Sequence, residues 1–286
     1  MREKVNGFVG VMAVAILCMV SGLCMVWGIA PVVLAVYVAA CAVCGRYMIT
    51  CIGCAAGVAA GSMGIAGLLH AYEYMIPGPA YSGVMVTEKY LVLLGLAMCL
   101  MKIVYSRNSR SYVRVIVVMS AAVLMGNIVV YADNMLMAAA YGVVEAAIFM
   151  CASVILKPGI GLLYTYICGD ASDVERDESW NISQGIVSLM ALAAVVLWVV
   201  PGEDIYGVNP AFMQALVLIL YAVYRTGAVY GCGMAAVAGS IVSVKLNDSR
   251  WLMWMLLVTL VMLIGRALTG RRKVSASLFY VLGCVE

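Results

Sequence analysis

Charged side chains are scarce in this sequence. Asp, Glu, Lys and Arg make up 11% of the 286 residues, whereas a soluble domain carries roughly a quarter. Histidine occurs once and phenylalanine four times. A P-loop, a Gly-x-Ser-x-Gly motif, a His-Glu-x-x-His motif and a Gly-x-Gly-x-x-Gly fingerprint are all absent. These absences argue against a soluble globular protein and against the common nucleotide-binding and hydrolytic enzymes.

Hydrophobic residues, in contrast, make up 66% of the chain, and the mean hydropathy is +1.08. A helix that crosses a bilayer needs about 20 apolar residues, and fewer suffice in tight bundles. We therefore predict an all-α fold, a polytopic membrane bundle that forms a single transmembrane domain over 1–286. The expected helices span residues 6–27, 29–45, 47–69, 90–106, 112–132, 134–156, 183–201, 210–224, 226–244 and 251–268.

The two ends of the chain carry further expectations. Val5 to Trp27 is long enough to span, and the bulky Leu23 stands where a signal-peptide cleavage site needs a small residue, so the first helix is expected to stay. An eleventh apolar run starts at Val274 and is too short to span before Glu286. This run predicts a partial last helix, in which the sequence stops.

The basic residues predict the orientation. The net charge is only +3, and the Lys and Arg residues lie in short loops, which is typical of membrane topology signals and not of nucleic-acid binding. Arg2 and Lys4 place the N-terminus in the cytoplasm, together with the cluster Lys102, Arg107, Arg110 and Arg114. Residues 210–244 fit either two short helices or one long bent helix, and two helices keep Arg271-Arg272-Lys273 inside.

The eleven cysteines include two Cys-x-x-Cys pairs, Cys41 with Cys44 and Cys51 with Cys54. Such pairs can ligate zinc or an iron–sulfur cluster. Here both pairs lie in apolar helical runs, and cysteine is also an ordinary small buried residue. A metal site is therefore not predicted. The acidic run 170–178 lacks the glycine and the alternating ligands of a calcium loop.

Small residues recur every four positions in two predicted helices. One stripe consists of Gly53, Gly57 and Gly61, and the other of Gly227, Gly231, Ala235 and Gly239. Such stripes let neighbouring helix backbones approach closely in lipid. We predict that both stripes are helix-packing surfaces, with Gly231→Leu more disruptive than Gly233→Leu.

Glu145 stands in the middle of an apolar run, where an ionisable group is expensive and is a functional suspect. Asn127 and Arg225 are the other intramembrane polar candidates. If the Glu145 carboxyl only packs, hydrogen-bonded to Asn127 or Tyr141, then Glu145→Gln should be nearly silent. The alternative is a small-solute transporter or channel with Glu145 in a polar path.

Five segments occur in an informative order and spacing. They are Gly28-Ile-Ala-Pro31, Val130-Tyr-Ala132 with Tyr141-Gly-Val-Val-Glu-Ala146, Asp177-Glu178, the glycine-rich 227–239 and Gly265-Arg-Ala-Leu-Thr-Gly-Arg-Arg-Lys273. In the order of these segments the chain resembles the N-terminal membrane region of the stage II sporulation protein E family of endospore-forming bacteria. It departs from that family at Ser21-Gly22-Leu23, where many members carry a Gly-Arg pair.

The resemblance implies a membrane anchor that precedes a cytosolic region and a manganese-dependent serine phosphatase of the PP2C type. That phosphatase leads to activation of sigma factor F. The resemblance also implies a septal membrane location during sporulation, with division-ring and septal proteins as partners beside the lipid bilayer and self-association. None of the phosphatase's metal-binding aspartates maps onto this chain. No catalytic, cofactor-binding or metal-ligating residue is therefore assigned, and manganese is expected only in the phosphatase part.

Overall fold

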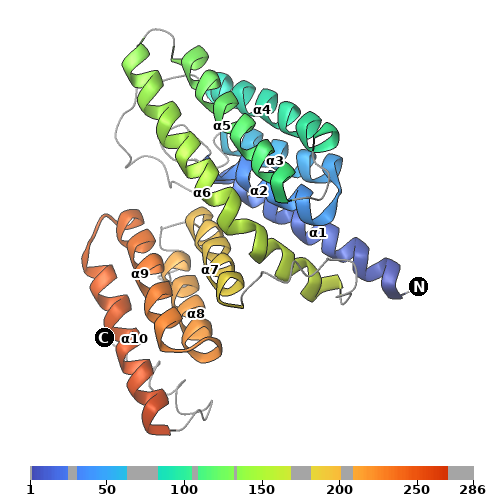
Figure 1. Cartoon of the computed structure of the whole chain (residues 1–286). Coiled ribbons are helices and arrows are strands. Elements are labelled where there is room, and N and C mark those ends of the chain that lie inside the picture. The colour runs from blue at the N-terminus through green and yellow to red at the C-terminus, as the bar shows by residue number, and fades with distance from the viewer. Residues whose placement is uncertain are drawn as a thin grey trace. The chain divides into compact units, whose positions relative to one another are not determined.

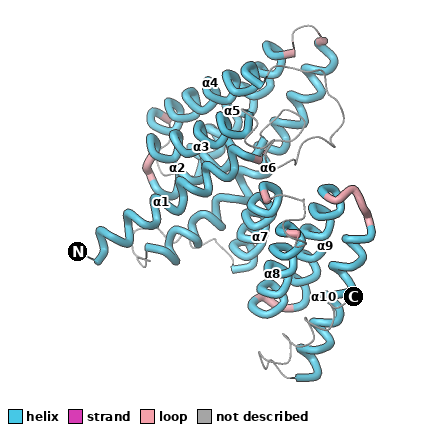
Figure 2. The backbone as a smooth tube through the Cα atoms, turned by 180° about the vertical axis from the view of Figure 1, so that it is seen from behind, coloured by secondary structure: helices cyan, strands magenta, loops and turns pink. Residues whose placement is uncertain are grey.

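The computed structural model describes residues 2–24, 31–62, 83–104, 109–131, 134–168, 182–200 and 209–269. The acidic run 170–178, the basic Arg271-Arg272-Lys273 and the last apolar run from Val274 lie outside these ranges. Throughout the described residues the structure is helical, with no strand, which confirms the all-α class (Figure 2). The helices are α1 (Arg2–Leu23), α2 (Pro31–Cys44), α3 (Tyr47–Ser62), α4 (Gly83–Ile103), α5 (Ser109–Val130), α6 (Met135–Cys168), α7 (Ile182–Val199), α8 (Pro210–Arg225), α9 (Ala228–Lys245) and α10 (Arg250–Thr269) (Figure 1).

The chain divides into two compact units, and the boundary falls within α7, between Leu192 and Ala193. The first unit contains α1 to α6 and the beginning of α7, and the second contains the end of α7 with α8, α9 and α10. Each unit is described by itself. The single transmembrane domain expected from the sequence stays a prediction.

Helix α2 forms the core of the first unit. Every residue from Val33 to Cys41 is at most 1% exposed, because α1, α3, α4 and α6 all pack against this helix. A helix that is hydrophobic on all sides is stable only when neighbours surround it. The short apolar sequence of α2 is therefore explained by its central position.

Helices α1 and α3 run parallel and nearly touch through their backbones. A Cβ added to Gly53 would lie 2.6 Å from the carbonyl oxygen of Ala15, and one added to Gly22 would lie 2.6 Å from the amide nitrogen of Val58. One added to Gly57 would overlap the carbonyl oxygen of Met19. Only glycine permits this approach, which increases the dispersion contacts between the two helices.

The second unit is built on a helical hairpin. Asn209 caps α8, because its side-chain oxygen accepts a hydrogen bond from the amide of Phe212 (2.9 Å), and Pro210 occupies the first turn. Helices α8 and α9 are separate, and between them Gly227 has a φ of 107° that favours glycine. Helix α10 then packs against both α9 and α8.

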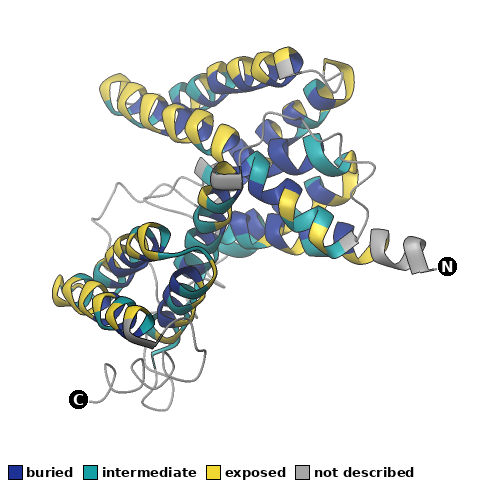
Figure 3. Cartoon of the chain, turned by 60° about the horizontal axis from the view of Figure 1, so that its bottom comes forward, coloured by how far each residue is buried: buried dark blue, intermediate teal, exposed yellow. Residues whose placement is uncertain are grey.

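Several helices carry large apolar side chains on their exposed faces. Figure 3 shows the exposed residues of each helix in yellow. In α5 and α6, Val117, Val129, Leu136 and Val154 are each more than half exposed. Within the described residues, four helical segments are long and apolar enough to cross a membrane. They are Arg110–Val130, Met135–Ile167, Ala228–Lys245 and Arg250–Ala267.

Candidate functional site

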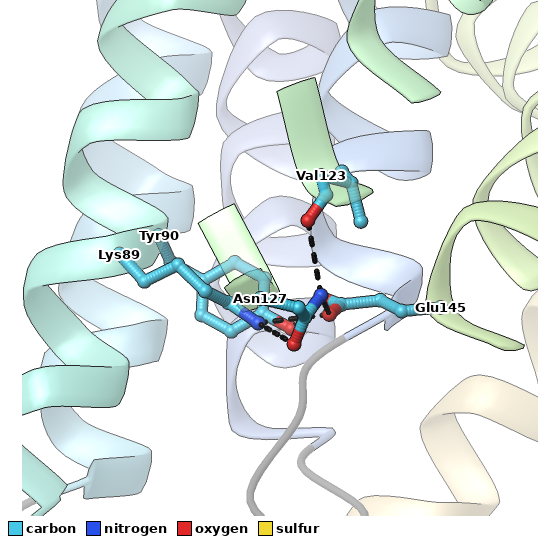
Figure 4. Close-up of polar contacts among 5 residues, drawn as sticks. All are labelled: Lys89, Tyr90, Val123, Asn127 and Glu145. Atoms are coloured by element: carbon cyan, nitrogen blue, oxygen red, sulfur yellow. Dashed lines mark hydrogen bonds and ion pairs between the residues drawn. The ribbon is translucent and has the colours of Figure 1, made fainter. Parts of the chain in front are cut away.

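Four polar side chains meet inside the first unit, where α4, α5 and α6 pack together (Figure 4). Lys89 and Tyr90 come from α4, Asn127 from α5 and Glu145 from α6. We call these four residues the polar cluster. The side chains of Lys89 and Glu145 are only 3% and 1% exposed, so the two charges are shielded from solvent.

The Glu145 carboxylate is the acceptor at the centre of the polar cluster. Its Oε2 accepts from the Lys89 ammonium at 2.8 Å and from the Asn127 amide nitrogen at 2.6 Å. Its Oε1 accepts from the Tyr90 hydroxyl. Both carboxylate oxygens therefore have donors, and a lysine supplies the compensating charge.

The donors are themselves held in place. Lys89 also donates to the Asn127 side-chain oxygen at 3.2 Å, and its ammonium lies 4.6 Å from the ring centroid of Tyr90. The Asn127 amide nitrogen donates further to the carbonyl oxygen of Val123 at 3.0 Å. A buried ion pair is stable only when such additional hydrogen bonds offset the loss of hydration. The polar cluster meets this condition.

Two glycines lie against the polar cluster. A Cβ on Gly126 would lie 3.4 Å from Cγ of Lys89, an ordinary van der Waals distance, so the α5 backbone lies close to the aliphatic part of the lysine. A Cβ on Gly142 would lie 3.5 Å from Cβ of Asn127 and 3.4 Å from Cα of Leu124. The close approach of α5 to α4 and to α6 is therefore part of the site.

Of the two partners that the sequence suggested for Glu145, Asn127 and Tyr141, the structure shows Asn127 in contact, and the sequence analysis missed Lys89 and Tyr90. The fourth helix was expected to begin at residue 90, whereas α4 begins at Gly83 and includes both side chains. Tyr141, the other suggested partner of Glu145, stacks instead on Tyr131, with ring centroids 5.2 Å apart. One signal could have revealed Lys89. The expected helix, 90–106, is shorter than the roughly 20 residues that a spanning helix needs, which indicates that the helix begins earlier in the chain.

Arg225, the third polar candidate, takes no part in the polar cluster. It is an exposed residue in the last turn of α8, within the second unit. The cation that acts at this end of α8 is Arg266 of α10, which donates to the carbonyl oxygen of Val223. At the other end of the hairpin, Lys245 donates to the carbonyl oxygens of Leu197 (3.0 Å) and Val200.

The second glycine stripe is divided between two neighbours. Gly231 faces α8, since an added Cβ would lie 2.5 Å from Cγ2 of Val223. Gly239 faces α10, where an added Cβ would lie 3.0 Å from Cδ1 of Leu252. Gly227 lies in the turn immediately before α9. Gly61 of the first stripe is half-buried near the end of α3.

Helix α6 continues past the point where the sequence predicted its end. Its 34 residues include Pro158, and a proline interrupts the hydrogen bonds of a helix. The amide of Gly159 donates to the Ser188 hydroxyl of α7 at 2.6 Å, and the Tyr112 hydroxyl of α5 donates to the carbonyl oxygen of Ser153 at 2.7 Å. Side chains of α5 and α7 therefore form hydrogen bonds with the α6 backbone on both sides of Pro158.

Cys41 and Cys54, one from each Cys-x-x-Cys pair, lie in the packing between α2 and α3. The Cys41 sulfur is 3.2 Å from the Thr50 hydroxyl, and the Cys54 thiol points to the carbonyl oxygen of Val33 at 3.9 Å. The four cysteines of the two pairs form no disulfide in the structure. These contacts are those of ordinary buried side chains.

Comparison with known proteins gave no match to a family model, to a curated protein or to a solved structure.

Proposed function

We propose that this chain is a non-catalytic membrane anchor and assembly region. The polar cluster carries the proposal, because the charge of Glu145 is used to join three helices. Its carboxylate accepts hydrogen bonds from Lys89, Tyr90 and Asn127, and the pair is almost completely buried. A group that carries protons or ions must exchange with water, whereas a saturated ion pair holds its helices together.

A membrane location is supported by the distribution of apolar side chains. Large apolar residues such as Val117 and Leu136 cover the outer faces of α5 and α6, and extended exposed apolar surface marks a membrane or protein interface. The Lys and Arg residues near the N-terminus and in the 102–114 loop favour a cytoplasmic location for both segments. A cysteine placed at position 108 should resist labelling from outside intact cells, and ready labelling would overturn this topology.

Within this class, the resemblance to the membrane region of stage II sporulation protein E supports a role in endospore formation. The proposed role is to hold a cytosolic phosphatase at the septal membrane, where sigma factor F is activated. Sequencing of the DNA downstream of codon 286 tests this assignment. A continuing frame that encodes acidic metal-binding motifs is expected, and a frame that encodes an unrelated domain would contradict it.

The competing function is solute or proton transport through a path that contains Glu145. The decisive experiment compares wild type with the double variant Lys89→Met/Glu145→Gln in proteoliposomes, with a pH-sensitive dye inside. We expect no proton flux above empty liposomes for either protein. A wild-type flux that the double variant loses while it remains folded would establish transport in place of the anchor.

A further inference from the structure

Helix α4 is joined to α6 by the side chains of Lys89 and Tyr90. Both extend to the Glu145 carboxylate, and the Lys89 ammonium also donates to the Asn127 side-chain oxygen of α5 (Figure 4). The backbones of the two helices pack mainly on other neighbours, α4 on α3, α5 and α2, and α6 on α2, α5 and α1. The polar cluster is therefore the main link between α4 and α6.

The buried face of α4 that follows Lys89 and Tyr90 is apolar and nearly repetitive. Leu93, Leu94, Ala97 and Met101 are at most 4% exposed, and they recur at intervals of three and four residues. Displacement of α4 by one turn, about 5.4 Å, would replace one apolar side chain of this face by the next. Apolar cores tolerate such exchanges and lose uniqueness before they lose stability. This face alone therefore does not specify a single position of α4.

The polar contact of α5 with α4 is made by Asn127, at 3.2 Å from the Lys89 ammonium. The other hydroxyl buried farther along α5, that of Ser120, bonds the carbonyl oxygen of Ile116 in its own helix at 2.8 Å. The position of α4 along its axis relative to α5 and α6, which we call its register, is thus marked by polar atoms only at the polar cluster.

The polar cluster does not tolerate a displacement of one turn. In the observed register the Lys89 ammonium is 2.8 Å from Oε2 of Glu145. One turn away, both charges would be buried without a counter-charge, which disfavours that register by roughly 100- to 1,000-fold. A single buried polar position fixes the register of helices in coiled coils by the same principle.

We propose that the Lys89–Glu145 pair sets the register of α4 against α5 and α6. The pair acts as a selector among apolar packings that are close in free energy. The inference goes beyond the proposed anchor function, because it uses the same polar cluster but does not depend on a membrane location. It predicts that a chain with an apolar pair at these two positions still packs α4, but in more than one register.

Two pairs of engineered cysteines report the register. A Cβ on Gly126 would lie 3.8 Å from Cδ1 of Leu93, so Gly126→Cys/Leu93→Cys should form a disulfide in the observed register. Gly126→Cys/Ala97→Cys places the second cysteine one turn farther away, and cysteines whose Cα atoms are more than about 7 Å apart are not bridged. The full chain is oxidised with copper–phenanthroline in detergent, and linked peptides are identified by mass spectrometry.

The decisive comparison places these probes in two backgrounds. With Lys89 and Glu145 present, we expect a link from position 93 and none from position 97. In the background Lys89→Met/Glu145→Leu, the link from position 97 should rise to a yield comparable with that from position 93. The control background Glu88→Gln/Lys102→Met also removes one acidic and one basic side chain of α4, both exposed, and should keep the selectivity of wild type.

Charge reversal gives a second measurement that does not depend on how well the apolar variant folds. In Lys89→Glu/Glu145→Lys the attraction is kept, and the Asn127 amide and the Tyr90 hydroxyl can each donate and accept. This variant should link only from position 93. A link only from position 93 in the apolar background, links from both positions in the reversed one, or a loss of selectivity in the control would overturn the proposal. The proposed function fails separately, through proton flux in proteoliposomes.

Discussion

In the first unit the Lys89 ammonium lies between helices and is neutralised by the Glu145 carboxylate. In the second unit Lys245 and Arg266 reach backbone carbonyls at the ends of α7 and α8 instead. The difference follows from helix geometry. Carbonyls inside a helix already accept intrahelical bonds, whereas the last four are available and carry the negative end of the dipole. A cation beside a helix interior therefore requires a carboxylate, and one beside a helix end does not.

The strongest way to break this comparison is to remove the carboxylate. Glu145→Gln keeps the shape of the side chain but leaves the Lys89 ammonium buried without its counter-charge. We expect a loss of about 3–5 kcal/mol of unfolding free energy, measured by denaturant titration in mixed micelles. Glu88→Gln, an exposed carboxyl one residue before Lys89, is the matched control and should stay within about 0.5 kcal/mol of wild type.

The double variant Lys89→Met/Glu145→Gln sharpens the same point. Replacing both charges removes the unpaired ammonium, and neutral substitution of a buried pair is often tolerated. We expect the double variant to be more stable than Glu145→Gln alone. Additive losses from Lys89→Met and Glu145→Gln would mean that the two side chains do not act as a pair.

The next largest effect contrasts glycines in the two units. A Cβ on Gly57 would overlap the carbonyl oxygen of Met19, which is backbone and cannot turn away. A Cβ on Gly231 would lie 2.5 Å from Cγ2 of Val223 and 3.2 Å from its Cα, so the overlap there is with a side chain and the backbone lies farther away. We expect Gly57→Ala to cost about 3 kcal/mol and Gly231→Ala about 1 kcal/mol. Equal losses in the same titration would show that α1 and α3 can separate as easily as α8 and α9.

Removing a helix-end cation should have a moderate effect. Lys245→Met leaves the carbonyls of Leu197 and Val200 without this donor, and hydrogen bonds to charged groups contribute about 1.5–3 kcal/mol. Because water can reach the half-buried site, we expect a loss of about 1–2 kcal/mol. Arg250→Gln is the control, since that arginine is exposed and its Nε is 4.0 Å from Asp248. A loss as large as that of Glu145→Gln would remove the distinction between the two kinds of cation.

These contrasts also show what the sequence can and cannot predict. Apolar runs located the helices, because a helix must be continuous in the chain. The sequence predicted an end at residue 156, whereas α6 continues through Pro158, a residue that disfavours a helix interior. No local signal shows that Ser188, 29 residues away, accepts a hydrogen bond from the Gly159 amide. Small residues at intervals of four predicted close packing, but which helix each glycine faces depends on tertiary structure.

Lys89 is the clearest case of missing tertiary information. It lies one residue before the helix expected over 90–106, so the sequence analysis did not consider it, and its partner lies 56 residues later. Glu145→Gln was expected to be nearly silent because only neutral partners were considered. With Lys89 in contact, the same substitution becomes the most damaging one considered. The sequence identified the carboxyl but not the charge that makes it necessary.

The smallest expected effect concerns the outer face of α4. Gly95 lies in the helix interior, and no atom lies within 4 Å of a Cβ added there. Alanine lowers the conformational freedom of the unfolded chain and is favoured over glycine in a helix. Gly95→Ala should therefore raise the unfolding free energy by about 0.5–1 kcal/mol, in the titration that shows a loss for Gly57→Ala. A loss of stability together with a smaller particle in gel filtration would mean that a second copy of the chain packs on this face, and that the self-association predicted from the sequence uses α4.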